Sequence, residues 1–177
     1  MIIVKHKFRN FENNSDIQFL ILGTFNPDAD DNNAEFFYGR GRNYLWNLLP
    51  KVFKHEELKT SSYLDKVSFI QTNKIGFLDI IQEVEVENGN ETNYADGFID
   101  SRVTKWTDFE SFIEKYSAIK KVYFTRKTFN GIPNMEERIG LIKKICRSRN
   151  IGFFILPTPA RFENQEKLNE WKQIFSL

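Results

Sequence analysis

The residues best suited to chemistry lie in one stretch, residues 36–46, which interleaves aromatic side chains with glycines and arginines. Tyr38 offers a flat face on which a base can stack, and Arg40 and Arg42 offer positive charge to phosphate. The Asn43 amide does not titrate near neutral pH, but its carbonyl oxygen can position a water molecule. The same pattern also fits a glycine-rich turn between core aromatics, with Asn43 as a helix N-cap.

Three further polar segments follow short apolar runs that are typical of strands. They are residues 23–28, 124–127 and 156–161. In an open parallel sheet, ligands bind beyond the carboxyl ends of the strands. We therefore expect these segments to converge with residues 36–46 at one edge of a sheet.

Apolar runs alternate with amphipathic stretches along the whole chain, which predicts an α/β fold. We expect a three-layer αβα sandwich around a central, mainly parallel four-stranded sheet, in a single domain that spans residues 1–177. The polar segment 88–96 is expected to be an exposed loop. The expected strands are residues 18–23, 76–86, 121–125 and 152–156. The expected helices are residues 43–53, 62–73, 107–116, 133–146 and 163–175, with a capping box over 107–110.

Composition and charge restrict the class of protein. The 177 residues suffice for one domain with one core, and 18 phenylalanines indicate a Phe-rich interior. The net charge of +1 gives no global basic field, so charge alone does not predict non-specific duplex binding. Cys146, the single cysteine, cannot form an internal disulfide or hold zinc or an iron–sulfur cluster, and we expect a buried thiol. With no signal peptide or membrane span recognised, we expect a cytoplasmic monomer without metal or cofactor.

Four blocks, in a fixed order that covers nearly the whole chain, carry a family resemblance. They are Leu20–Gly23 with Tyr38 and Asn43–Trp46; Gly76–Ile81; Lys121–Lys127; and Leu156–Ala160 with the Lys167, Leu168 and Trp171 spacing. In this order they resemble the uracil-DNA glycosylase superfamily, and most closely its hypoxanthine-DNA glycosylase branch. The second block is similar to that branch's Gly-x-x-x-Trp-Asp-Val segment, and the third to the Phe-Asn-Gly-Lys strand end of the family.

The resemblance implies that the partner is DNA containing a damaged base. Such an enzyme extrudes the base and hydrolyses its N-glycosidic bond through a transition state with oxocarbenium character. By resemblance, Asn43 orients the attacking water, and Asn26 is the second candidate for this catalytic role. Tyr38 matches the base-stacking aromatic, although it also fits a core aromatic whose role Phe36 or Phe37 takes over.

Further binding roles follow from the same resemblance. Backbone amides at Gly23, Thr24 and Phe25 are expected to bind the base, and Asp79 either shapes the pocket or simply ends a strand. The side chain of Arg161 either probes the minor groove or is a solvated surface charge. The expected DNA contacts are Arg126, Lys127, Pro157, Thr158, Ala160 and Arg161. His6 and His55 are isolated in sequence and receive no role.

The chain also departs from the family pattern. Most relatives carry Asp, Asn or Glu where this chain has Phe25, and Asn26 follows one place late. Leu156 replaces the His of many relatives, as in the hypoxanthine branch. The leading hypothesis is therefore a glycosylase for uracil or hypoxanthine, and the alternative is a catalytically weak or inactive member that binds DNA or a nucleobase. A third class, an unrelated nucleotide-binding α/β protein, is disfavoured because no Gly-x-Gly-x-x-Gly or Gly-Lys-Ser/Thr motif occurs.

Overall fold

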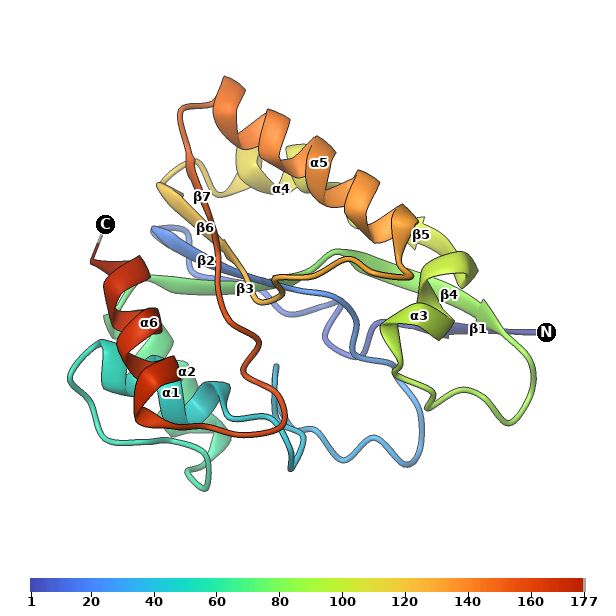
Figure 1. Ribbon diagram of the computed structural model, residues 1–177, viewed down its shortest axis with the longest axis horizontal. Coiled ribbons are helices and arrows are strands. Elements are labelled where there is room, and N and C mark those ends of the chain that lie inside the picture. Colours follow the sequence, from blue (N-terminus) through green and yellow to red (C-terminus); the bar gives the residue numbers. More distant parts are fainter. Residues whose placement is uncertain (177) are drawn as a thin grey trace.

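The computed structural model describes residues 1–176 and is built around a four-stranded parallel sheet (Figure 1). The strand order is β3-β2-β6-β7, and every neighbouring pair is parallel, which confirms the predicted central sheet. All four strands therefore end at the same edge of the sheet. The strands are β2 (Phe19–Gly23), β3 (Ile75–Asp79), β6 (Lys121–Phe124) and β7 (Gly152–Ile155).

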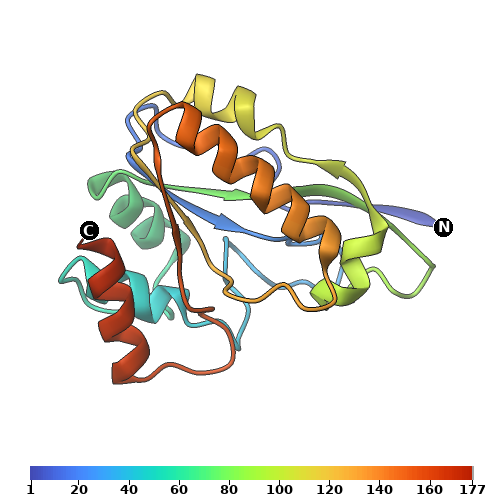
Figure 2. The ribbon, with the colours of Figure 1, turned by 45° about the horizontal axis from the view of Figure 1, so that its top comes forward.

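Helices cover both faces of this sheet, as Figures 1 and 2 show. Alternate β2 side chains explain the two faces, because Leu20 and Leu22 belong to one core cluster and Ile21 to the other. Helices α4 (Phe109–Lys115) and α5 (Pro133–Ser148) pack on the first cluster. Helices α1 (Leu45–Val52), α2 (Tyr63–Thr72) and α6 (Gln165–Phe175) pack on the second. The expected αβα layering is confirmed.

A second, three-stranded antiparallel sheet was not expected. Its order is β1-β4-β5, and the prediction of a single strand over residues 76–86 is wrong because this segment contributes to both sheets. The chain changes sheets at Ile80, whose backbone N–H donates to the Gly23 carbonyl at 3.0 Å. Next, the Ile81 N–H donates to the Thr24 carbonyl at 3.1 Å. The strands are β1 (Ile2–Lys5), β4 (Ile81–Val86) and β5 (Val103–Trp106).

The loop expected over residues 88–96 is observed as turns and coil through Ala95, in the segment between β4 and β5. This segment ends in a short helix, α3 (Asp96–Ile99), followed by the 3-10 helix η1 (Asp100–Arg102). The capping box expected over residues 107–110 is also wrong, since Asp108 caps α4 by accepting from the Ser111 N–H at 3.1 Å. The Thr107 hydroxyl instead donates to the Asp79 carbonyl at 2.6 Å.

Buried phenylalanines occur in both core clusters, and two of them belong to residues 36–46. Phe36 and Phe37 are 1% and 3% exposed, so these aromatics do not offer the exposed stacking faces suggested by the sequence pattern. Phe37 stacks on Phe77 with ring centroids 5.4 Å apart, and Trp46 donates its indole N–H to the Phe37 carbonyl at 2.8 Å. The expected buried thiol is confirmed at Cys146. The core thus anchors this segment and leaves Tyr38 at its boundary, half-buried.

Candidate functional site

The candidate site lies where β2, β3 and β6 end. The Tyr38 hydroxyl is 3.0 Å from Thr125 Oγ1, just beyond the end of β6. A Cβ atom on Gly23 would lie 2.7 Å from the Tyr38 hydroxyl oxygen and 2.3 Å from Asp79 Oδ1. Only a glycine at the end of β2 permits this close approach. The structure thus brings the predicted residues Gly23, Tyr38 and Asp79 together.

Tyr38 is held in an unusual backbone conformation. Its φ of 57° lies in the left-handed region, which is uncommon for an aromatic residue. Burial raises the pKa of the Tyr38 hydroxyl well above its ordinary value, and the Asp79 carboxylate adds to this effect. The hydroxyl therefore stays protonated and acts as a neutral hydrogen-bonding group.

Asp79 has a buried partner that the sequence did not reveal. His6 Nε2 lies 2.7 Å from Asp79 Oδ2, and the two residues are 2% and 6% exposed. The backbone N–H of Phe8 donates to His6 Nδ1 at 3.1 Å. His6 reaches the site because β1 pairs with β4 and the His6 N–H extends that ladder to the Gln82 carbonyl. No local signal links residues so far apart in the sequence.

Asn43 joins the loops that follow β2 and β7. It forms an isolated antiparallel bridge with Ala160, and the flanking Tyr44 N–H donates to the Pro159 carbonyl at 2.8 Å. Asn43 Oδ1 accepts from the Leu45 N–H at 3.0 Å, at the start of α1. The residue is half-buried and lies one position before the N-cap residue, Tyr44. The expected convergence of these two loops is therefore observed.

Asn26 occupies a different setting inside the loop after β2. It is 5% exposed, and its Oδ1 accepts from Asn32 Nδ2 at 2.5 Å. Its backbone carbonyl accepts from the Lys7 N–H at 2.7 Å. The preceding Phe25 is 9% exposed and packs in the core, with its ring centroid 6.0 Å from that of His6. These contacts fix the loop rather than present an amide to solvent.

Charged contacts link the segment before and at the start of α3 to Arg126 and Arg40. The Asp96 carboxylate, at the start of α3, forms an ion pair with Arg126. Burial raises the pKa of Asp96, an effect that Arg126 and Thr24 partly offset. Arg40 lies over the Tyr94 ring, with its guanidinium carbon 3.3 Å from the ring centroid. Burial lowers the pKa of Arg40.

Four basic side chains near the site fall into two groups: the predicted DNA contacts Arg126, Lys127 and Arg161, together with Arg42. Arg126 and Lys127 are each engaged by a carboxylate, those of Asp96 and Glu170. The exposed Arg42 and Arg161, by contrast, have no carboxylate within 4.0 Å among residues 1–176. These two residues are joined through the Arg161 N–H, which donates to the Arg42 carbonyl at 2.9 Å. Two guanidinium groups without a carboxylate partner among residues 1–176, those of Arg42 and Arg161, therefore belong to the two loops that meet at Asn43.

The loop after β7 is held from α6. Trp171 donates its indole N–H to the Pro157 carbonyl at 3.1 Å, and the Lys167 ammonium donates to the Phe162 carbonyl at 2.6 Å. Thr158 is exposed and accepts from the Ala160 N–H at 3.3 Å. The loop thus presents Thr158 and Ala160 on a supported backbone.

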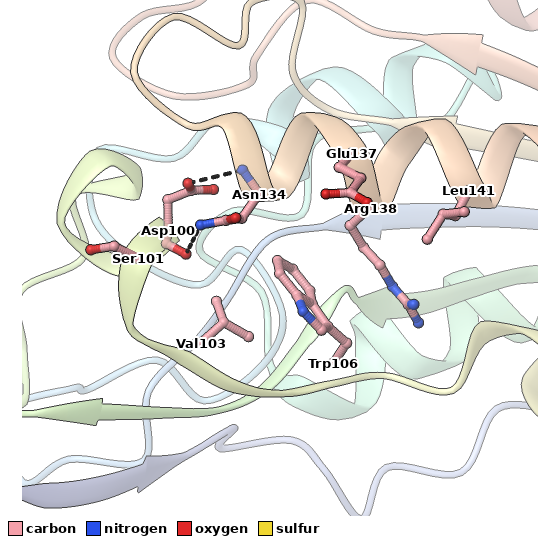
Figure 3. Close-up of a pocket in the computed structure, with 8 residues that line it drawn as sticks. All are labelled: Asp100, Ser101, Val103, Trp106, Asn134, Glu137, Arg138 and Leu141. Atoms are coloured by element: carbon pink, nitrogen blue, oxygen red, sulfur yellow. Dashed lines mark hydrogen bonds between the residues drawn. The ribbon is translucent and has the colours of Figure 1, made fainter.

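A separate hollow of about 300 Å³ lies beside η1 and α5 (Figure 3). Its buried carboxylate, Asp100, accepts from the backbone N–H groups of Asn134 and Met135 at 3.0 and 2.7 Å. Asp100 therefore caps α5, which explains its burial. Within residues 1–176, no three His, Cys, Asp or Glu side chains are grouped to hold a metal ion, and no helix is long and apolar enough to cross a membrane.

Comparison with known proteins identifies the fold. No protein-family model and no curated protein matches the sequence. Among solved structures, the chain is similar to a solution NMR structure from Methanosarcina acetivorans described as a putative uracil DNA glycosylase. The TM-score is 0.63, with 20% sequence identity over 92% of this chain and 91% of that chain. The chain therefore has a uracil-DNA-glycosylase-like fold.

Proposed function

We propose that this protein is a DNA glycosylase of the uracil-DNA glycosylase superfamily that extrudes and excises a deaminated base, uracil or hypoxanthine. The observation that carries the proposal is the meeting of Gly23, Tyr38 and Asp79 at the edge of the sheet. A tyrosine ring and a carboxylate that converge over a glycine are suited to bind a flat, polar base. The uracil-DNA-glycosylase-like fold supports the proposal, because the solved structure that shares it is described as a putative uracil DNA glycosylase.

Asn43, Arg42 and Arg161 extend the proposed site toward the DNA backbone. The Asn43–Ala160 bridge holds the proposed water-positioning amide beside the two arginines that lack carboxylate partners among residues 1–176. Such arginines can neutralise phosphates and so fix the register of a duplex. Catalysis then requires that Asn43 Oδ1 orient a water toward the sugar carbon as the base leaves.

Two contacts favour a second candidate, a protein that binds a damaged base without excising it. The Asn43 and Asn26 amide oxygens both accept hydrogen bonds from the protein, and Phe25 occupies the usual position of the acid. The decisive experiment is incision of duplexes containing uracil, hypoxanthine or a thymine mismatch, beside a gel shift with the same duplexes. Incision of at least one lesion supports the enzyme, and a lesion-specific shift without incision supports the binding protein. If no duplex is incised and none is shifted, both candidate functions are refuted.

A further inference from the structure

Arg40 has a half-buried guanidinium group whose N–H donors have no acceptor among residues 1–176. Its guanidinium carbon lies 3.3 Å from the centroid of the Tyr94 ring, which belongs to the segment between β4 and β5. In the same described range, no carboxylate lies within 4.0 Å of Arg40. Contact with an aromatic face holds a guanidinium group without using its N–H donors. The donors of Arg40 are therefore available to a ligand.

The carboxylates that act on Arg40 lie in the proposed base site and at its border. Burial lowers the pKa of Arg40, and the Asp79 and Asp96 carboxylates oppose this effect. Asp79 borders Gly23 in that site, and Asp96 is already engaged by Arg126. An arginine side chain keeps its proton in proteins, so Arg40 remains a cation. This cation is therefore close enough to the base site to interact with charge that develops there.

Excision of a base leaves negative charge on the base. The N-glycosidic bond breaks with its electron pair passing to the base, where conjugation carries the charge to a carbonyl oxygen of uracil or hypoxanthine. The oxygen of water forms the new bond to the sugar carbon, and the proton that the water releases ends on the base. A fixed donor beside the carbonyl oxygen stabilises this charge strongly, because the dielectric constant is low in a half-buried site. The Asp79 carboxylate carries the wrong sign of charge for this task, so a cation is needed.

We propose that Arg40 is a catalytic residue that donates a hydrogen bond to the carbonyl oxygen of the departing base, and that Tyr94 is the positioning residue that holds the guanidinium group. The inference rests on the proposed function and deepens it by naming the group that stabilises the leaving base. Arg40 keeps its proton throughout, so it stabilises charge without acting as an acid. A phosphate contact fits Arg40 less well, because its side chain is half-buried whereas Arg42 and Arg161 are exposed.

The quality of the leaving group tests this role. Single-turnover excision is measured with duplexes that contain uracil or 5-fluorouracil, whose fluorine withdraws electrons and makes the base a better leaving group. Arg40→Met retains an unbranched side chain without charge or donors. It should slow excision of uracil about 100-fold or more, the range for losing one donor to a developing charge, and should slow excision of 5-fluorouracil roughly tenfold less. For a protein that excises only hypoxanthine, 2-fluorohypoxanthine replaces 5-fluorouracil in the comparison.

Two results would overturn the inference while leaving the proposed glycosylase intact. One is an unchanged excision rate in folded Arg40→Met protein. The other is equal slowing for the two bases together with a slope of log affinity against log salt that falls by about one, which would assign Arg40 to a phosphate.

The matched control is Arg102→Met. The guanidinium carbon of Arg102 lies 3.9 Å from the Phe98 ring centroid, but its guanidinium group is already paired with Glu87 at 3.6 Å. This substitution should leave both excision rates unchanged. A loss in Arg102→Met that is also larger for uracil than for 5-fluorouracil would contradict the assignment to Arg40.

Substitutions of Tyr94 test the positioning role. Tyr94→Phe retains the ring under Arg40 and should keep the rate, whereas Tyr94→Leu removes the ring and should slow uracil more than 5-fluorouracil. A merely structural Tyr94 would slow both bases equally. Circular dichroism checks the fold, and if Arg40→Met unfolds, the two Tyr94 variants decide. If the unaltered protein incises no lesion duplex, the proposed function and this inference fall together.

Discussion

Asn43 and Ala160 form an antiparallel bridge that connects the loop after β2 to the loop after β7. The bridge spans the carboxyl edge of the parallel sheet, whose strand order places β6 between β2 and β7. Arg42 and Arg161 flank it, and a backbone hydrogen bond of 2.9 Å joins them. The bridge therefore couples the proposed catalytic amide to the exposed positive charge.

This coupling predicts which basic residues contact phosphate. Arg42→Gln and Arg161→Gln should each reduce the slope of log affinity against log salt by about one, as expected for one lost phosphate contact. Lys127→Gln is the matched comparison and should change the slope less, because Glu170 already engages this ammonium group. Titrations of one lesion duplex at several salt concentrations provide the measurement. A larger effect at Lys127 than at either arginine would be inconsistent with this assignment.

The ring of Tyr38 should contribute directly to binding. Stacking on a base is worth about 1–3 kcal/mol, so Tyr38→Ala should weaken binding to lesion DNA by that amount. Tyr38→Phe keeps the ring and removes only the hydroxyl that bonds to Thr125, so it should retain most of the affinity. Alanine and phenylalanine are both restricted at the positive φ of residue 38, so neither variant gains the backbone freedom that a glycine would introduce. Unchanged affinity of folded Tyr38→Ala protein would show that the ring does not stack on the base.

The sequence allowed prediction of the parallel sheet because its signals are local. Phe19–Gly23 is apolar on both faces, as a strand covered by two helix layers must be, and Asn43 adjoins a helical pattern. The division at Ile80 has no such signal, since Ile80 and Ile81 are both apolar and no glycine or proline lies between Gly76 and Val86. The chain changes sheets here only because β3 pairs with β2, whereas β4 pairs with β1 and β5.

The same reason explains which site residues were missed. His6 meets Asp79 only through the β1–β4 ladder, and Asp96 meets Arg126 only because α3 folds toward the end of β6. Isolated histidines and charges in polar loops have no periodicity to indicate a partner. Gly23 and Tyr38 were recognisable because they lie within one family-like block.

Cys146 predicts a pH dependence of stability. Burial raises the pKa of its thiol from 9.0 to about 12. Between these values the unfolded chain loses the proton and the folded chain keeps it, so the stabilisation present below pH 9 is lost as pH rises toward 12. At one unit above the unfolded pKa, the loss is about 1 kcal/mol. The free energy of unfolding is measured by urea titration at several pH values for Cys146→Ala and for the unaltered protein. The variant should be less stable near neutral pH, and its stability should fall less steeply above pH 9. An equally steep fall in the variant would show that Cys146 is not the cause.

Asn43 and Asn26 should differ most clearly in single-turnover excision. Asn43→Ala should slow excision from a uracil duplex about 100-fold or more, the range for losing one positioned catalytic group. Asn43→Asp should keep or raise the rate, because a carboxylate is a stronger charge partner for an oxocarbenium ion than an amide. Asn26→Ala should slow excision less and act mainly on stability, because Asn26 Oδ1 bonds to Asn32 within the loop.

The control for local structure is Asn43→Ser, whose hydroxyl can still accept from the Leu45 N–H that Asn43 engages at 3.0 Å. If Asn43 only caps this turn, Asn43→Ser should retain activity, and Asn43→Ala should lose about 0.5–2 kcal/mol of stability with little change in rate. If Asn43 orients water, the serine variant should fold normally yet remain slow, because its shorter side chain cannot place an acceptor at the same point. A crippled Asn26→Ala protein beside an active Asn43→Ala protein would reverse the two roles, since the buried loop amide would then be the group on which excision depends.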